Sequence, residues 1–264
     1  RSLKTLFDKE VNERAPRDNF FHCLVNAAHQ FHRRESNDDR YIIAGYPWFK
    51  CRARDTFISL PGLTLSIEED DYFELVMKTA MKGYYEFMEG KPVTVHIAEI
   101  DQPDVPLWAV WALQQYAKEK GKEACLKKYG KFIKDVVMYV KCNHHPNLKL
   151  MPNGLLYTDG KDKAVTWMNS TANGHPVVPR TGYIVEFNAL WYNALCFCAS
   201  LCELAGKEKD QQQFLEAAEL AKQSFLDTFL NEYGYLYDYV DGKMIDWSVR
   251  PNMIFPVAFD YSPL

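Results

Sequence analysis

The sequence predicts an all-α protein whose helices form roughly antiparallel pairs. Apolar residues recur at helical spacing along most of the 264-residue chain. Capping residues, glycines and prolines divide this pattern into segments of helix length. No low-complexity linker and no second compositional regime separates one part of the chain from another. We therefore expect a single domain over residues 1–264 with about eight helices.

Five helices are expected in the first half of the chain. Pro61 and Gly62 should end the second one, because proline lacks a backbone donor and glycine suits a helix C-terminus. Ser66, followed by acidic residues, fits the start of the third. Asp104 suits the N-cap of the fourth, with Pro106 in its first turn. These helices are expected at residues 18–34, 55–62, 66–90, 104–121 and 122–142, with a short strand-like stretch at residues 41–49.

The second half begins with a long irregular stretch, residues 144–182. It contains many turn residues but is rich in Trp, Tyr, Leu and Val, which favours a functional loop over disorder. Helices at residues 183–205 and 210–230 should follow, then a β-hairpin turning at Asp241-Gly242 and a last helix from about Arg250. The long loops would meet at one end of the helical pairs, around a shared cleft. A plain bundle or solenoid is the alternative.

Composition narrows the class of function. The formal charge is −4, so neither nucleic acid nor an anionic membrane is an expected partner. Three of the seven cysteines lie in the apolar run WYNALCFCASLCEL, and no CxxC pair occurs. The first ten residues lack an apolar signal core, and no apolar run is long enough to cross a bilayer. These features indicate a reduced, cytoplasmic protein.

Four segments combine Trp with Asp, Glu, Asn and Arg in loops and at helix starts. They are AGYPWFKCRARDTFISLPGL, DQPDVPLWAVWAL, TWMNSTANGHPVVPRTGYIVEFNALWYNAL and DWSVRPNMIFPVAF. A neutral polyol needs carboxylates, amides and guanidinium groups as hydrogen-bond partners, and aromatic walls for its faces. The chain contains no phosphate loop, dinucleotide fingerprint, HExxH motif or nucleophile elbow. The residue inventory therefore favours a carbohydrate ligand.

At these four segments the chain resembles the α-1,6-glucosidase domain of glycogen debranching enzymes. The resemblance implies an (α/α)6 toroid of twelve helices with its site at one mouth, of which about eight would be present here. It also implies inverting hydrolysis of α-1,6-linked glucose at glycogen branch points, with glycogen or limit dextrin as partner. Two carboxyl groups suffice for that reaction, so neither a metal nor an organic cofactor is expected. An incomplete toroid would leave apolar faces uncovered, which predicts self-association.

The resemblance also assigns the catalytic positions. The family's general acid follows Trp-Met, and the residue there is Asn169, whose amide has no proton to give. The family's base lies beyond the RPN segment, in helices expected after Leu264. Hydrolysis by this chain is therefore expected to be impaired. Glu186 is a second catalytic candidate, and if buried it would need a partner such as Arg180.

The remaining candidates would bind the substrate. Arg54 and Asp55 would hold the terminal glucose, the alternative being a salt bridge with Asp55 as a helix N-cap. Trp167 is a candidate for stacking on a sugar ring. We expect Arg54, Asp55, Asp104, Trp167, Asn169, Arg180 and Glu186 to converge on one pocket mouth. The full set of binding candidates is Arg54, Asp55, Asp104, Trp108, Trp167, Arg180, Asn188, Trp191, Arg250 and Asn252, the last two as supporting residues.

Two other functions fit the same residues. Loss of the acid could leave a non-catalytic glucan-binding module. Alternatively, a toroid hydrolase of another α-glucoside could use Asp159 or Asp162 as its acid, although Asp159 also fits a solvated turn before Gly160. The His144-His145 pair before Pro146 is expected to be a polar turn and not a metal site.

Overall fold

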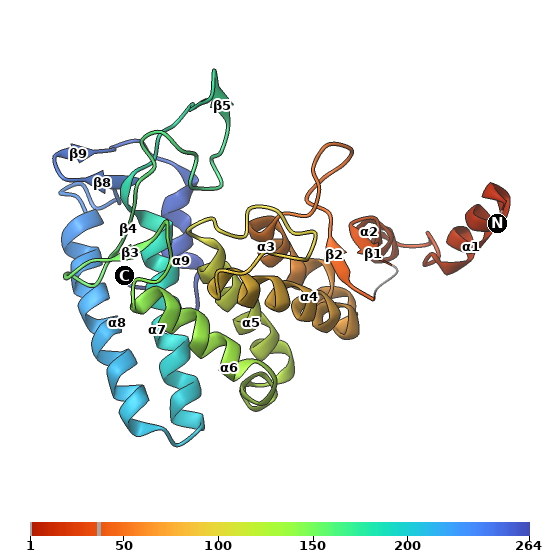
Figure 1. The fold of residues 1–264 in the computed structure, drawn as a ribbon, viewed down its shortest axis with the longest axis horizontal. Helices are drawn as coiled ribbons and strands as arrows, with labels where there is room; N and C mark the ends of the chain where they lie inside the picture. The colour runs from red at the N-terminus through yellow and green to blue at the C-terminus, as the bar shows by residue number, and fades with distance from the viewer. Residues whose placement is uncertain (1, 36–37) are drawn as a thin grey trace.

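The computed structural model describes residues 2–35 and 38–264, and they are mostly helical (Figure 1). The helices are α1 (Leu3–Glu13), α2 (Phe20–His29), α3 (Ala53–Leu63), α4 (Asp70–Met88), α5 (Val105–Lys120), α6 (Lys122–Lys141), α7 (Val185–Leu204), α8 (Glu208–Phe229) and α9 (Phe255–Ala258), with 3-10 turns η1 (Leu65–Ile67) and η2 (Pro251–Ile254). The strands are β1 (His32–Arg34), β2 (Arg40–Ile42), β3 (Lys149–Leu150), β4 (Leu156–Thr158), β5 (Thr171–Ala172), β6 (His175–Pro176), β7 (Gly182–Ile184), β8 (Tyr239–Asp241) and β9 (Met244–Ile245). The predicted helical majority is confirmed, with small antiparallel sheets added to it. None of the described helices has the length and apolar character needed to cross a membrane.

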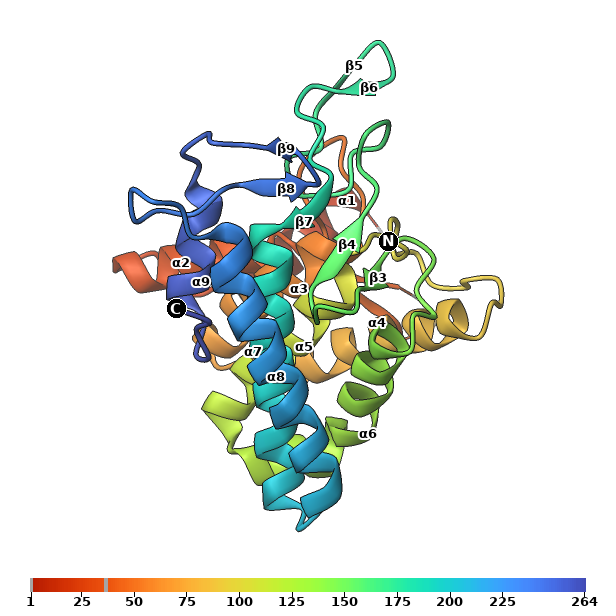
Figure 2. The ribbon, with the colours of Figure 1, turned by 90° about the vertical axis from the view of Figure 1, so that its left-hand side faces the viewer.

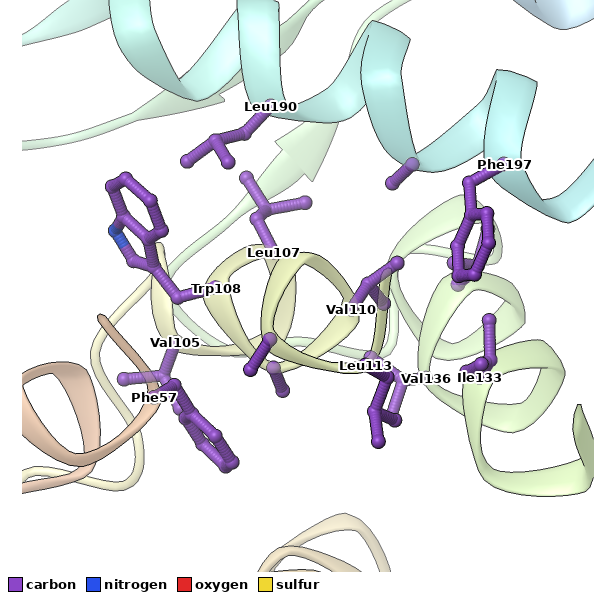
Figure 3. Packing of buried hydrophobic residues seen from close by; sticks show 14 of the residues in the cluster. Phe57, Val105, Leu107, Trp108, Val110, Leu113, Ile133, Val136, Leu190 and Phe197 are labelled. Carbon is purple, nitrogen blue, oxygen red and sulfur yellow. The ribbon is translucent and has the colours of Figure 1, made fainter. Parts of the chain in front are cut away.

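Helix α5 forms the centre of the core. Its sequence is apolar almost all round, and a helix of that kind is buried on every side. Figure 3 shows Leu107 and Trp108 of α5 facing Leu190 of α7, and Val105 facing Phe57 of α3. On its remaining side α5 packs against α6. The site described below therefore rests on a rigid helical base.

The five-stranded sheet and the β5–β6 hairpin lie at one end of the α7–α8 pair, whereas the β1–β2 pair lies beside α2 (Figures 1 and 2). The main sheet has the order β3-β4-β7-β8-β9, with every pair antiparallel. Strand β7 leads directly into α7. Gly182 begins β7 with φ of 85°, and a Cβ there would stand 2.3 Å from the carbonyl oxygen of Val240. Only glycine fits this close strand contact.

The N-terminal segment differs from the prediction. Helix α1 was not expected, and the helix predicted at 18–34 ends at His29, where the chain turns into β1. Pairing of β1 with β2 overrides the helical periodicity of residues 32–34. Phe20 and Phe21, in the first turn of α2, are exposed.

Other element boundaries moved by a few residues. The helix predicted from Ser66 begins at Asp70, because a 3-10 turn and a left-handed Glu68 (φ 63°) come first. The hairpin forms as predicted, with Asp241 paired to Met244 so that Gly242 lies in the turn. The last predicted helix is reduced to η2 and the short α9.

The polar turn predicted at residues 144–146 is confirmed for His144 and wrong for His145. His144 is exposed, but His145 is buried against the rings of Phe87 and Tyr139. Its Nδ1 accepts a hydrogen bond of 3.1 Å from the backbone N–H of Asn147, and its Nε2 has no partner among the described residues. Burial lowers the pKa of His145 to about 4. The imidazole is therefore neutral in the folded protein at physiological pH.

We expect His145 to make stability depend on pH. Between pH values of about 6.5 and 4 the unfolded chain binds a proton at His145 that the folded chain does not, so stability falls as pH falls through this window. The shift from 6.5 to about 4 corresponds to a loss on the order of 3 kcal/mol at about 1.4 kcal/mol per pKa unit. Urea unfolding at several pH values should show a weaker dependence for His145→Asn. His144→Asn is the control. If the free energy of unfolding of His145→Asn changed with pH as steeply as that of the wild type, His145 would not be the group responsible.

Candidate functional site

A cleft of about 480 Å³ opens beside the first turns of α3. This volume is within the range of small-molecule sites. Four of the predicted site residues line it: Arg54, Asp55, Trp167 and Asn169. The complete lining is Phe31, Ile43, Ala44, Phe49, Arg52, Arg54, Asp55, Ile58, Ser59, Leu63, Trp167 and Asn169.

Arg54 points from α3 into the protein and pairs with Asp104. Its Nε donates to Oδ2 of Asp104 at 2.6 Å and its Nη2 donates to Oδ1 at 2.8 Å, while both side chains are almost fully buried. The indole Nε1 of Trp108 donates to the same carboxylate at 3.2 Å. Asp104 does precede α5, but its side chain makes no cap hydrogen bond. The predicted N-cap position of Asp104 is therefore confirmed, but its carboxylate does not cap the helix, because Arg54 and Trp108 hold it.

Asp55 faces the cleft from the first turn of α3. It shares the cleft-facing side of the helix with Ile58 and Ser59, three and four residues further on. Arg52 is the residue that precedes the helix, so Asp55 is not its N-cap. Within the described residues the Asp55 carboxylate accepts no hydrogen bond from a protein group, and no other carboxylate lines the cleft. Its oxygens are therefore available to hydroxyl groups of a ligand.

Trp167 lines the same cleft. The residue is 45% exposed, whereas the preceding Thr166 is buried and its hydroxyl accepts a hydrogen bond of 3.1 Å from the backbone N–H of Met168. The indole Nε1 donates a 2.8 Å hydrogen bond to Oδ1 of Asn252. Asn169 follows two residues later and is also exposed. An aromatic face and an amide thus lie on the same cleft as the Asp55 carboxylate.

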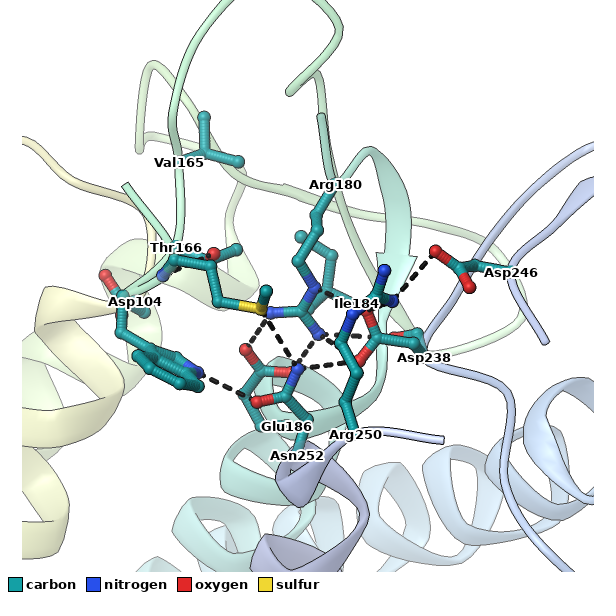
Figure 4. Close-up of polar contacts among 12 residues, drawn as sticks. Asp104, Val165, Thr166, Arg180, Ile184, Glu186, Asp238, Asp246, Arg250 and Asn252 are labelled. Atoms are coloured by element: carbon teal, nitrogen blue, oxygen red, sulfur yellow. Dashed lines mark hydrogen bonds and ion pairs between the residues drawn. The ribbon is translucent and has the colours of Figure 1, made fainter. Parts of the chain in front are cut away.

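Figure 4 shows a buried ionic network in which Arg180, Arg250 and Asn252 surround Asp238. Arg180 is at its centre, and its guanidinium contacts two carboxylates at once. Its Nε and Nη2 donate to Asp238 at 2.8 and 3.0 Å, and its Nη1 and Nη2 donate to both oxygens of Glu186. Arg250 reaches the same Asp238 at 2.7 Å and Asp246 at 2.8 Å.

Asn252 connects this network to the cleft. Its Nδ2 donates to Oδ1 of Asp238 at 2.6 Å, and its Oδ1 accepts from Trp167. Arg250 and Asn252 are thus placed as the sequence suggested, behind the residues that line the cleft. The position of the Trp167 ring depends on Asp238 through a single amide side chain.

Glu186 is paired with Arg180, as its burial required, but it does not line the cleft. Only 1% of the side chain is exposed and both oxygens are bonded to Arg180. Burial raises the pKa of the Glu186 carboxyl, and the Arg180 guanidinium opposes this only in part. A carboxylate enclosed in this way orients its partner and cannot reach a ligand in the cleft. Of the seven residues expected to converge on one pocket mouth, four line the cleft. Three do not line it: Asp104, Arg180 and Glu186.

Three further residues predicted to bind the substrate are buried in the protein interior. Trp108 packs edge-on against Trp111 and Phe255. Asn188 bonds the backbone N–H and carbonyl of Leu156, and Trp191 donates to the carbonyl of Gly154. All three are buried, so the expected contact with a substrate is not supported by their placement.

Asp238 is the network residue that sequence reasoning missed. It is fully buried just before β8, flanked by Tyr237 and Tyr239. The available signal was charge balance, because the buried Arg180 and the half-buried Arg250 need more carboxylate than Glu186 alone provides. Arg52 was also missed, although it lines the cleft and lies over the ring of Phe49 at 5.0 Å.

Asp159 and Asp162 lie on a separate hollow. They line it together with Asp101 and Tyr157, and none of the cleft-lining residues named above takes part in it. Asp159 also accepts a hydrogen bond from the backbone N–H of Lys161 at 3.3 Å, which is the turn contact expected from the sequence.

The chain was compared with models of known protein families. The family model described as amylo-alpha-1,6-glucosidase matches residues 25–264. No curated protein matches the chain.

Proposed function

Because the chain belongs to the amylo-α-1,6-glucosidase family, we propose that its cleft holds a terminal glucose residue of an α-glucan such as glycogen or limit dextrin. The observation that carries the proposal is the joint presence of Asp55, Trp167 and Asn169 on one cleft. Asp55 and Arg52 supply an acceptor and donors for hydroxyl groups, and the Trp167 ring supplies an apolar face. The helices would form part of an (α/α)6 toroid with this cleft at its mouth, acting in cytoplasmic glycogen breakdown.

The chemistry of the cleft favours binding over hydrolysis. Inversion at the anomeric carbon needs an acid and a base on opposite faces of the sugar. Asn169, at the position we assign to the general acid, carries an amide that cannot protonate the glycosidic oxygen. Asp55 is the single carboxylate of the described lining. We therefore propose that this chain has weak α-1,6-glucosidase activity, with a non-catalytic glucan-binding module as the second candidate.

We expect Trp167→Ala to weaken glucan binding about tenfold, which corresponds to about 1.4 kcal/mol. The substitution removes the apolar face while the polar residues of the cleft remain. Isothermal titration with isomaltose and with limit dextrin would measure the change. Trp247→Ala is the matched control, since Trp247 is 44% exposed but packs on Tyr237 away from the cleft residues. Equal effects of the two substitutions would contradict the proposed stacking role.

We also propose self-association through α1 and α2. Helix α1 buries none of its residues, and Phe7 on α1 and Phe20 on α2 are both largely exposed. A second copy of the chain would cover these apolar side chains. Phe7→Ser combined with Phe20→Ser should weaken the dimer at least about tenfold in sedimentation velocity. A wild-type chain that stays monomeric at all concentrations would refute this.

A further inference from the structure

Two histidines and a glutamate meet next to Phe31 and Leu63, two of the residues that line the cleft. His29 ends α2, His32 begins β1, and Glu69 precedes α4. One ligand atom from each residue lies within 4.8 Å of the others. The Nε2 of His29 is 2.5 Å from Oε1 of Glu69, and the Nδ1 of His32 is 3.5 Å from Oε2 of the same carboxylate. The end of α2, the start of β1 and the residue before α4 therefore bring two imidazole nitrogens and a carboxylate oxygen close together.

These separations suit a small divalent transition-metal ion. Zn²⁺ bonds to imidazole and carboxylate at about 2.0 Å, so two ligands of a tetrahedral site stand about 3.3 Å apart. The observed separations lie on both sides of that value, and small side-chain rotations would bring them to it. Two imidazoles and one carboxylate also form the ligand set of zinc sites that keep a fourth position for water.

The hydrogen bonding of His32 provides independent support. Its second ring nitrogen, Nε2, lies 2.9 Å from the carbonyl oxygen of Leu63. A carbonyl accepts only, so Nε2 carries the proton and Nδ1 presents a lone pair toward Glu69. Metal-bound histidines are typically fixed in this way by a second-layer acceptor.

The surroundings of His32 hold the ring in place. The imidazole stacks on Tyr72 with 3.9 Å between ring centroids, and the Tyr72 hydroxyl donates to the carbonyl of Tyr41. A simple ion pair between His29 and Glu69 would not explain why the Nδ1 lone pair of His32 also faces Glu69. It would not explain why the tautomer of His32 is fixed by the carbonyl of Leu63.

We propose that His29, His32 and Glu69 form a binding site for one divalent transition-metal ion, with Zn²⁺ as the best match. The ion would fasten the end of α2 and the start of β1 to the start of α4. The proposal departs from the expectation that the chain binds no metal, which concerned the chemistry of hydrolysis. It does not rest on the proposed function. Phe31 and Leu63 line the cleft, and His32 follows the first and bonds the carbonyl of the second, so the ion would stabilise this part of the cleft.

Titration of the metal-free full chain with Zn²⁺ alone tests the proposal. The exposed thiols Cys23 and Cys142 would first be replaced by serine, because they bind zinc themselves. We expect one Zn²⁺ per chain in calorimetry, a higher melting temperature with Zn²⁺, and visible absorption typical of four-coordinate Co²⁺ when Co²⁺ is used instead. His29→Ala, His32→Ala and Glu69→Gln should each weaken binding by more than about 100-fold, the upper range for loss of a second-layer contact.

His22→Ala is the matched control. His22 forms an exposed pair with Asp18 at 2.5 Å, which offers a metal only two ligands. Binding should be unchanged in this variant. Glu69→Gln keeps the shape of the side chain, so it tests the site even where an alanine variant does not fold. Absence of stoichiometric Zn²⁺ binding in the parent, or equal affinity in Glu69→Gln and His22→Ala, would overturn the proposal.

Discussion

Replacing Asp238 by alanine is expected to lower the free energy of unfolding by about 3–5 kcal/mol, the range measured when one partner of a buried ion pair is removed. Asp238 accepts hydrogen bonds from Arg180, Arg250 and Asn252, and none of its side chain is exposed. Without it, the Arg180 guanidinium stays buried with only Glu186 as its counter-ion. Urea unfolding followed by circular dichroism would measure the loss.

Asp246→Ala is the control for this prediction. Asp246 pairs with Arg250 and with the backbone N–H of Ser248 at the edge of the network, so its removal should cost about 1 kcal/mol. Asp238→Asn should fall between the two, because it keeps a hydrogen-bond acceptor but loses the charge. A loss below about 1 kcal/mol in Asp238→Ala would show that Arg180 does not depend on Asp238.

The same substitution should disturb the cleft. Asp238 accepts from Asn252, and Asn252 in turn accepts from the indole N–H of Trp167. The Trp167 ring should therefore gain freedom in Asp238→Ala, and its fluorescence should shift toward that of a solvated indole. The stability of the buried network and the geometry of the proposed binding site are linked through this one contact.

Local sequence signals predicted the features that depend on local physics. Helices α7 and α8 lie within a few residues of the predicted positions, because their apolar periodicity, acidic first turns and Gly206 all agree. The Arg180–Glu186 pair followed from the cost of burying a carboxylate alone. Asp55, Trp167 and Asn169 do share one cleft, as the motifs suggested.

Features that depend on long-range contacts were not predictable in this way. Asp238 lies 58 residues after Arg180, and nothing in its own neighbourhood marks it as the partner of two arginines. Strand β1 was assigned to a helix, because its pairing with β2 is a tertiary contact that periodicity does not reveal. Asp104 fitted an N-cap by position, and only the structure shows Arg54 and Trp108 bonded to its carboxylate.

The largest effect on activity is expected from Asn169→Asp. This substitution should raise the rate of α-1,6-glucoside hydrolysis by the full-length protein roughly 10²–10⁴-fold, the usual contribution of one general acid or base. Asn169 is exposed on the cleft beside Trp167, so a carboxyl group there would meet the ligand directly. Asn173→Asp is the matched control, since it adds the same charge to the same exposed loop and does not line the cleft.

The pH dependence should identify the role of the new carboxyl group. A general acid acts in its protonated form, so the rate should fall as pH rises through the pKa of Asp at position 169. The carboxylate of Asp55 on the same cleft would raise that pKa, because two like charges disfavour ionisation of the second. Hydrolysis of isomaltose, followed by NMR, should release the β-anomer first, as inversion requires. A rate that stays at the level of Asn173→Asp would show that position 169 does not hold the acid.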